Sequence, residues 1–477
     1  MADLRIATLA GSESSLDEAE VERLGSRLRG ELLRSVDTGY EEARSLWNGV
    51  IDRRPALIAR CAAVEDVVET VNFARENDLL LAVRGGGHNV AGTASVEGGL
   101  VLDLSAMKEI EVDPAGRAVR AGAGVTIGEL DGETQKHGLA TPMGVVSETG
   151  IAGLTLNGGM GHLRRKHGLS SDNLLSVEVV TADGRLLKAS EEENAALFWA
   201  VRGGGGNFGV ITSFEYRLHP VGPEVMCAFV FYPGDRAVEV LRSVEEYMTD
   251  APDEVSPLSF LGRVPRVEDF PEEWHGKQFI GILAVFDGPV EDGEEALESL
   301  RGLGDPIVDF SGPMPYTEVQ KLLDEDYPDG WHYYWKSVNV DGLGEDVIEA
   351  LMEQAEAAPS DHSTIDVWFQ GGAMGRIGAD ESAFGDRSAS ILLGIEANWE
   401  DDPEEDEANI AWARGCYSDL RRFSGGGVYL NFPGFLEEGQ GLMRDAYGEN
   451  YERLVHLKNQ YDPANLFRLN QNIEPTG

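Results

Sequence analysis

Basic residues and cysteines are scarce in this chain of 477 residues, and each shortage excludes a class of protein. The 39 lysines and arginines are outnumbered by 84 aspartates and glutamates, which gives a formal net charge of −45. A field of this sign repels nucleic acids and anionic membranes, so we expect neither as a partner. The three cysteines, Cys61, Cys227 and Cys416, lie far apart, which excludes a disulfide framework, a zinc ribbon or a CxxC redox motif; we also expect no metal site.

Long apolar runs, internal repeats and low-complexity linkers are also missing. No run is long enough to span a membrane, and the N-terminal residues have no apolar signal core or twin arginine, so we expect a cytoplasmic protein. The acidic residues are spread along the whole chain. This spread is typical of proteins from a high-salt cytoplasm, although many of the carboxylates also fit an ordinary helix surface.

A chain of this length with 42% hydrophobic residues is expected to fold as two globular domains. Residues 1–218 are rich in glycine and short strands, and the proline-containing segment 219–223 follows them as a plausible boundary. In residues 219–422, strands alternate with acidic helices, which predicts an α+β domain on an antiparallel sheet. Residues 423–477 again contain glycine-rich stretches like those of the N-terminal part. Helices are expected near residues 15–35 and 441–459.

Three glycine-rich runs are the first indication of a ligand-binding function, at residues 85–87, 157–161 and 203–206. Glycine allows a backbone to approach a ligand closely, and successive amides in such turns bind phosphate oxygens. One run alone is best explained as a tight turn, but three in one half of the chain favour a dinucleotide. None of them has the spacing of a Rossmann site, so a tightly held NAD is disfavoured.

His88 directly follows the first glycine run, at the end of a predicted buried strand. Such a histidine is either a simple turn residue or a nucleophile that is presented to a ligand bound by the neighbouring amides. The residues alone leave both interpretations open.

Four segments together resemble one family of flavoenzymes. Residues 81–89 (LAVRGGGHN) resemble the histidyl-flavin motif of the vanillyl-alcohol oxidase / p-cresol methylhydroxylase superfamily, in its berberine bridge enzyme-like branch. Residues 142–174, 202–212 and 461–473 resemble three further signatures of that branch, in the same order. The resemblance implies an α+β, two-domain FAD-binding fold of the p-cresol methylhydroxylase type, with a central antiparallel-sheet substrate domain and a C-terminal segment that completes the FAD-binding domain.

The resemblance further implies FAD bonded through its 8α carbon to His88. A neutral imidazole can form this bond with the electrophilic flavin, and the bond raises the oxidising power of the flavin. The residues expected to bind the cofactor are Arg84, Gly85, Gly86, Gly87, His88, Asn89, Gly144, Val146, Ser147, Thr149, Gly150, Gly153, Leu154, Asn157, Gly158, Gly159, Gly161, His162, Asp172, Asn173, Gly209, Val210, Tyr429, Asn431 and Asn470.

Two of these positions allow more specific predictions, about the number of covalent bonds to the flavin and about the electron acceptor. Some relatives attach the flavin a second time through a cysteine, and Val146 stands at the matching position, so we predict a single covalent bond. Thr149 matches the position near the flavin C4a carbon that governs access of oxygen. Its shape resembles that of valine, which favours an oxidase.

The residues predicted to act on the substrate are supported by weaker sequence patterns than the cofactor-binding residues. Relatives carry a catalytic glutamate on the strand matching residues 391–398, but Leu392 stands at that position. Glu396 points to the same face and is the predicted base, although a solvated edge carboxylate is an equal alternative. Tyr429 is a second candidate base if a nearby cation lowers its pKa. Lys336 is predicted to bind or polarise the substrate. Asp386 replaces a frequent family histidine, so the substrate preference can differ from that of other members.

These observations predict an FAD-dependent oxidoreductase that acts on CH–OH or CH–NH groups of a small polar molecule, with oxygen as the electron acceptor. A dehydrogenase with a quinone or protein acceptor is an alternative within the same class. A flavin-binding protein without turnover is the alternative from another class. The sequence does not predict the oligomeric state.

Overall fold

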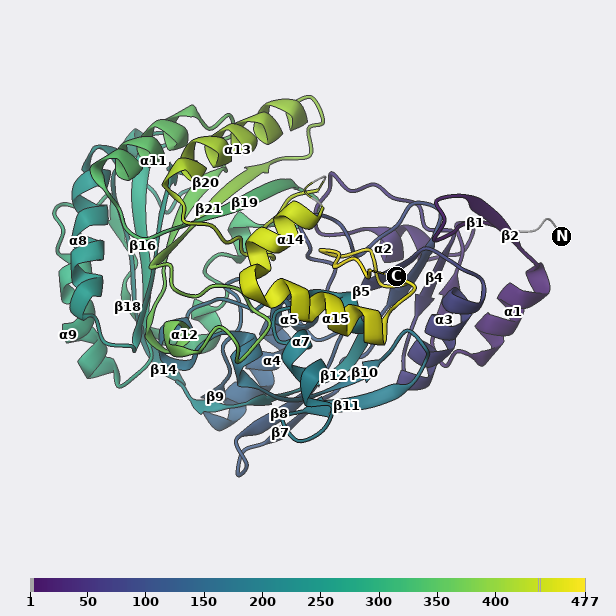
Figure 1. Cartoon of the computed structure of the whole chain (residues 1–477). Helices are drawn as coiled ribbons and strands as arrows, with labels where there is room; N and C mark the ends of the chain where they lie inside the picture. Colours follow the sequence, from purple (N-terminus) through teal and green to yellow (C-terminus); the bar gives the residue numbers. More distant parts are fainter. Residues whose placement is uncertain (1–3, 436, 438, 477) are drawn as a thin grey trace.

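The computed structural model describes residues 4–435, 437 and 439–476. Two regions of different architecture stand side by side in Figure 1, and the C-terminal helices lie between them. No helix in the described part of the chain combines the length and the apolar character that a bilayer crossing requires.

The N-terminal region contains two main sheets. One has the order β3-β4-β6-β5, with β4, β5 and β6 parallel, and its strands are β3 (Glu31–Leu33), β4 (Leu57–Arg60), β5 (Leu81–Arg84) and β6 (Leu100–Asp103). The other is antiparallel, with the order β11-β10-β12-β8-β7: β7 (Ile110–Asp113), β8 (Ala118–Gly122), β10 (Leu174–Val180), β11 (Leu186–Ser190) and β12 (Val210–Arg217). Two small ribbons complete the set: β1 (Leu4–Ala7) with β2 (Glu13–Leu16), and β9 (Leu139–Ala140) with β13 (His219–Pro220).

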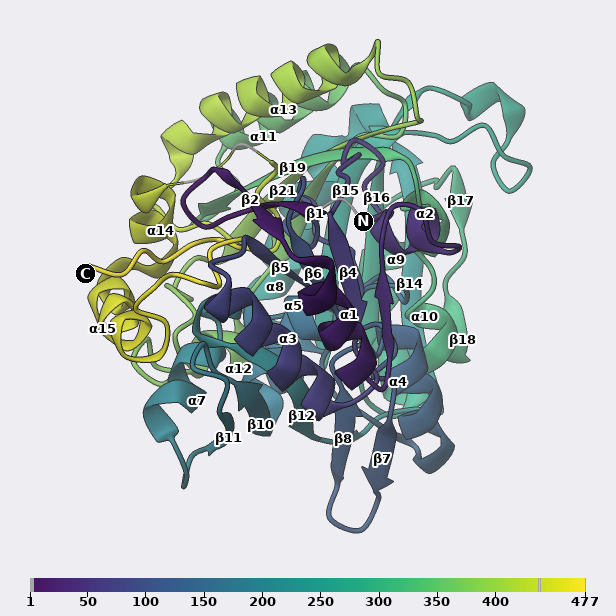
Figure 2. The same ribbon diagram turned by 90° about the vertical axis from the view of Figure 1, so that its right-hand side faces the viewer.

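Helices pack on these sheets and on one another. Helices α1 and α3 lie side by side in Figure 2 and are in contact. The helices of this region are α1 (Glu18–Arg27), α2 (Tyr40–Arg44), α3 (Val64–Glu76), α4 (Ile127–Thr134), α5 (Ile151–Leu156), α6 (Arg164–His167) and α7 (Ala195–Val201). Helix α1 is shorter than predicted. Asp17 caps its start by accepting from the Ala19 amide. After its end, Gly30 packs so tightly on the Arg60 carbonyl that a side chain would collide with it.

The central region is built on one large antiparallel sheet with the order β17-β14-β16-β15-β20-β21-β19, and β18 pairs with β14. Its strands are β14 (Glu224–Pro233), β15 (Val255–Arg263), β16 (Gln278–Phe286), β17 (Val308–Asp309), β18 (Gly312–Pro315), β19 (His332–Val340), β20 (Thr364–Phe369) and β21 (Ile391–Trp399). Helices α8 (Ala237–Asp250), α9 (Val290–Arg301), α11 (Glu345–Ala357) and α13 (Asp406–Leu420) cover its outer face in Figure 1. The short helices α10 (Tyr316–Val319) and α12 (Gly372–Arg376) lie in its connections.

Strict alternation along β19, β20 and β21 divides the central sheet into two faces. Ile365, Val367, Leu393 and Ile395 belong to the hydrophobic core beneath the helices. The intervening side chains point to the opposite face, where the N-terminal region lies. The sheet therefore presents one row of side chains per strand toward the N-terminal region.

The C-terminal segment packs against the N-terminal region. Tyr447, Leu454 and Phe467 share one hydrophobic core with Phe198 and Phe208. The single helix predicted here is two helices, α14 (Gln440–Tyr447) and α15 (Tyr451–Tyr461). The break falls at Gly448, whose φ of 51° lies outside the right-handed helical region. The fold is thus α+β with two domains, as predicted.

Candidate functional site

A deep cavity lies between the N-terminal region and the inner face of the central sheet. Its walls come from the loop after β5, the loop that leads into α5, the start of β12, the C-terminal tail, and side chains of β19, β20 and β21. Two of the wall loops touch backbone to backbone, because a Cβ on Gly86 would lie 2.6 Å from the Cα of Gly150. Glycine at both positions is what allows this close approach.

Most residues predicted from the sequence to bind the cofactor line this cavity. They are Gly85, Gly86, Gly87, His88, Asn89, Gly144, Val146, Thr149, Gly150, Gly153, Leu154, Asn157, Gly209, Val210, Tyr429, Asn431 and Asn470. Their segments are far apart in the sequence, and folding brings them together. Asn470, for example, is followed directly by a stretch of tail that Asn207 fixes, by donating to Gln471 O and accepting from the Ile473 amide.

His88 lines the cavity, and its side chain is partly buried. Its ring stacks on Trp47 with centroids 3.9 Å apart, and Trp47 stacks in turn on Tyr333. Burial lowers the pKa of His88 to about 4, so the imidazole is neutral at physiological pH. Its Nε2 atom has no hydrogen-bond partner among the described residues. Because the side chain lines the cavity, a neutral and oriented imidazole is available to an electrophile there.

The composition of the wall fits a dinucleotide. The side-chain oxygens Asn157 Oδ1 and Asn470 Oδ1 are buried without a partner in the described structure, and both residues line the cavity. The lining contains no lysine or arginine. Any pyrophosphate held here would therefore be bound by neutral amide donors and glycine backbone, as expected for a protein of this negative charge. These residues fit FAD.

Glu396 lies on the inner face of β21, directly opposite Trp335 of β19 in the strand register. Its side chain lines the cavity and is 2% exposed. Tyr327 donates a hydrogen bond of 2.7 Å to its Oε2 atom. Burial, reinforced by the neighbouring Asp366 carboxyl, raises the pKa of Glu396 well above its usual range. This environment is that of a buried acid–base group and differs from that of a solvated edge carboxylate.

Tyr429 lines the same cavity and is fixed by two donors. Its hydroxyl accepts hydrogen bonds from the Met160 amide at 3.0 Å and from the Asn431 side chain at 2.9 Å. Asn431 also donates to Leu154 O, which ties this pair to helix α5. Burial raises the pKa of Tyr429, and its hydrogen-bonding partners are amides rather than a cation. The condition under which Tyr429 was a candidate base is therefore not met, and its hydroxyl remains protonated at neutral pH.

Lys336 does not reach the cavity. Alternation along β19 places it on the helix-covered face, where its ammonium pairs with Glu437 at 2.9 Å and lies over the Tyr417 ring. Contrary to the prediction, Lys336 is therefore not placed to contact a substrate in the cavity. Trp335, the neighbouring residue, points into the cavity instead.

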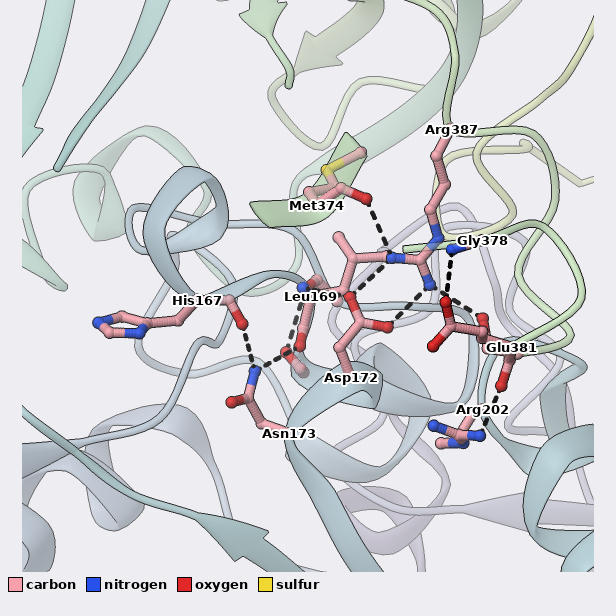
Figure 3. A network of polar contacts seen from close by, with 12 residues as sticks. His167, Leu169, Asp172, Asn173, Arg202, Met374, Gly378, Glu381 and Arg387 are labelled. Carbon is pink, nitrogen blue, oxygen red and sulfur yellow. Dashed lines mark hydrogen bonds and ion pairs between the residues drawn. The ribbon is translucent and has the colours of Figure 1, made fainter. Parts of the chain in front are cut away.

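Asp172 and Asn173 also lie outside the cavity. Figure 3 shows Asp172 in a paired contact with Arg387, and the two hydrogen bonds measure 2.7 and 2.8 Å. Asn173 donates to the carbonyls of His167 and Leu169. Instead of facing a ligand, the Asp172 carboxylate anchors the loop that carries Phe384 against Gly158 and Gly203.

The remaining predicted residues support the wall from behind. Ser147 donates to Asp324 through its hydroxyl and its amide, and Arg84 donates to Ala43 O. His162 is buried with an unpartnered Nε2, but it does not line the cavity. The other three positions outside the lining are glycines that pack against neighbouring chain: Gly158, Gly159 and Gly161.

Apart from Tyr429, sequence reasoning missed the aromatic side chains of the cavity. Tyr327, Trp335, Trp368 and Phe432 all line it. Trp335 was recoverable, because it neighbours Lys336 and alternation allows only one of the two to face inward. Tyr327 belongs to a connecting segment without a motif, and nothing in the sequence pattern places it next to Glu396.

Comparisons with known proteins identify the family. The family description "FAD binding domain" matches residues 55–190, and "Berberine and berberine like" matches residues 428–474. An FAD-linked oxidoreductase of Dictyostelium discoideum is 33% identical over 94% of this chain and 95% of its own length. The (R)-6-hydroxynicotine oxidase of Paenarthrobacter nicotinovorans is 32% identical over 94% of this chain and 98% of its own.

Solved structures give the same result. The 6-hydroxy-D-nicotine oxidase of Arthrobacter nicotinovorans superimposes with a TM-score of 0.84 at 31% identity, covering 94% of this chain and 98% of that one. A carbohydrate oxidase of Microdochium nivale shares the fold, with a TM-score of 0.84 at 22% identity over 96% of this chain and 100% of that one. The chain is an FAD-dependent oxidoreductase and belongs to the berberine bridge enzyme-like family of FAD-linked oxidoreductases.

Proposed function

We propose that the protein holds FAD through a single covalent bond to His88 and oxidises a CH–OH or CH–NH group of a small polar substrate, with oxygen as the electron acceptor. The observation that carries the proposal is the His88 side chain, which is neutral, held by stacking on Trp47 and part of the lining of a glycine-rich cavity. FAD, when bound, supplies the acceptor for the hydride that leaves the substrate carbon.

The covalent bond is tested by acid precipitation of three proteins purified in high salt: the native chain, His88→Ala and His162→Ala. His162 is a matched control, because it is also buried, unpartnered at Nε2 and lowered in pKa to about 3, yet lies outside the cavity. We expect yellow pellets from the native chain and His162→Ala, and a colourless pellet from His88→Ala. Flavin released into the supernatant by the native protein would overturn the histidyl bond.

Glu396 is the proposed base that takes the hydroxyl or amine proton as the substrate is oxidised. Its carboxyl faces the cavity, and the Tyr327 hydroxyl fixes its orientation. A raised pKa brings its proton affinity closer to that of the group it must deprotonate. Glu396→Gln preserves the shape and removes the base, so we expect slow flavin reduction with unchanged flavin content. Reduction at the native rate would refute the assignment.

Oxygen as acceptor is supported by Thr149, a small side chain in the cavity wall, and by relatives that are named oxidases. Enzyme that has been reduced anaerobically should reoxidise rapidly when mixed with air. Slow reoxidation in air, with rapid reoxidation by a quinone, would instead establish a dehydrogenase.

A further inference from the structure

Trp47 lies between the loop after β5 and the central sheet, and three of its contacts concern the site. Its indole stacks on the His88 ring with centroids 3.9 Å apart and planes 15° apart, and on the Tyr333 ring of β19 at 3.7 Å and 11°. Two rings cannot stack on the same indole face at such distances without colliding, so the indole lies between them. The third contact is its Nε1–H, which donates to the Tyr327 carbonyl at 2.8 Å. Both faces of the indole and its one donor are therefore engaged.

The backbone that carries Trp47 is fixed to both regions of the molecule. The next residue, Asn48, is fully buried, and its Nδ2 donates to Val90 O in the loop after β5 and to Tyr333 O at the start of β19. Its Oδ1 accepts from the Tyr333 amide at 3.1 Å. The Gly330 amide donates to Trp47 O at 2.9 Å. These bonds leave the backbone under the indole little freedom, so the ring stays where its contacts place it.

The contacts of the indole reach two different parts of the proposed reaction. His88 is the proposed attachment point of the flavin. Tyr327 donates through its hydroxyl to Glu396, the proposed base. These three side chains line the cavity, whereas Trp47, which is 4% exposed, does not. Trp47 can therefore act on the site only through the residues that it touches.

We propose that Trp47 is a positioning residue with two separate actions. Its ring face orients the His88 imidazole for bonding to the flavin. Its N–H holds Tyr327 in the place from which the hydroxyl of that residue reaches Glu396. This inference rests on the proposed function and assigns a further residue to it.

The first action concerns the direction of the imidazole. A stacked indole prevents the His88 ring from turning, and a reaction between two held groups depends steeply on their orientation. The bond joins an imidazole nitrogen to the flavin 8α carbon in place of one hydrogen, and the imidazole loses its N–H proton. Oxygen, the proposed acceptor, takes the two electrons and both protons as hydrogen peroxide. The second action is simpler, because a hydrogen bond at the Tyr327 carbonyl fixes the backbone that carries the Tyr327 hydroxyl.

Two variants separate the actions, and the chain offers a matched control. Trp47→Leu removes both the ring and the donor, whereas Trp47→Phe keeps an aromatic face and removes only the donor. Trp412 is also a buried tryptophan, and its Nε1 donates to Gln354 O at 2.9 Å, but it lies outside the cavity lining. Trp412→Leu and Trp412→Phe therefore remove the same groups at a place unconnected with His88 or Tyr327.

The first measurement follows attachment of the flavin over time. The chain is made by cell-free synthesis, FAD is added, and covalent flavin is read as fluorescence on acid-treated denaturing gels. A misplacement of about 1 Å can slow a reaction roughly a hundredfold, so we expect attachment to be at least about tenfold slower in Trp47→Leu. Trp47→Phe and both Trp412 variants should attach flavin at nearly the native rate. A native rate in Trp47→Leu would overturn the first action, as would equal slowing in Trp412→Leu.

The second measurement reads the Glu396 carboxyl directly and needs no substrate. The infrared band of its carboxylic acid is identified by its loss in Glu396→Gln and is titrated with pH, with the neighbouring Asp366 unchanged throughout. The hydrogen bond from Tyr327 lowers the pKa of Glu396, so loosening it should move the midpoint to higher pH. We expect this shift in Trp47→Phe and in Tyr327→Phe, with no further shift when the two are combined. The Trp412 variants should keep the native midpoint.

An unmoved midpoint in Trp47→Phe would overturn the second action, as would shifts that add in the double variant, because the indole would then not act through Tyr327. The infrared measurement keeps the inference testable if Trp47→Leu does not fold. A native chain that never attaches flavin would refute the proposed histidyl bond, and the infrared titration would still decide the action on Tyr327. Equal attachment in the native chain and Trp47→Leu would instead refute the orienting action and leave the bond to His88 intact.

Discussion

The paired contact between Asp172 and Arg387 should contribute strongly to the free energy of unfolding and little to flavin binding. Both side chains are nearly inaccessible, at 4% and 3% exposure. Asp172 accepts two hydrogen bonds from the guanidinium and a third from the Leu169 amide, and Arg387 also donates to the Ser382 hydroxyl. Asp172→Asn keeps the shape of the side chain but leaves the arginine cation buried without its counter-charge.

Breaking a buried ion pair in this way costs about 3–5 kcal/mol. The unfolding entropy of a chain of this size is about 1 kcal/mol per kelvin, from roughly 2 cal/mol per kelvin per residue. The expected fall in melting temperature is therefore about 3–5 °C. Exchange of both partners, as Asp172→Asn with Arg387→Met, removes the uncompensated charge and should restore part of the loss.

Thermal unfolding followed by circular dichroism measures this effect, with flavin content determined on the same samples. Asp183→Asn is the control, because its ion pair with Arg185 is exposed and should contribute less than about 1 kcal/mol. The prediction is a lower melting temperature with undiminished covalent flavin. An unchanged melting temperature combined with loss of flavin would refute the reasoning and return Asp172 to the cofactor site.

Three further perturbations test other parts of the account. Tyr327→Phe removes a hydrogen bond that lowers the pKa of Glu396, so the acidic limb of the pH profile for flavin reduction should move to higher pH; an unmoved limb would separate Glu396 from the proton transfer. Val146→Cys places a thiol in the cavity wall and should allow a second covalent bond, visible as a flavin-bearing peptide that contains residue 146; its absence would show that Val146 does not face the flavin. Raising the salt from about 0.01 to 1 M shortens the screening length from roughly 30 to 3 Å, so a chain of net charge −45 should gain thermal stability. A melting temperature that is flat or falls with salt would contradict the expectation, drawn from the acidic sequence, that the protein suits a high-salt cytoplasm.

Local sequence patterns were sufficient to predict most of the residues that line the glycine-rich side of the cavity. The first glycine run and His88 lie in one short segment whose role depends on backbone geometry that glycine itself dictates, whereas the glycines of the second run lie outside the cavity lining. Alternation was sufficient to place Glu396 inward, since a residue two positions from another shares its face. The same rule placed Lys336 away from the cavity, once Trp335 is known to face it.

Long-range partners were not visible in the sequence. The role of Asp172 depends on Arg387, which lies 215 residues later, and no local pattern announces such a pairing. Tyr327 meets Glu396 across 69 residues in the same way. The N-terminal helix was predicted too long, because its periodicity continues past Arg27 toward Gly30, which is packed tightly on Arg60. The C-terminal helix was predicted as one element, because its periodicity continues across the break at Gly448.

Peptide mapping of the native protein tests the central claim most directly. Trypsin should release a fragment that begins after Arg84 and contains His88, and mass spectrometry under acidic denaturing conditions reads whether it carries flavin. The account predicts one flavin on this fragment, assigned to His88, and none on any other. A fragment of unmodified mass, with free FAD or with flavin attached elsewhere, would contradict it.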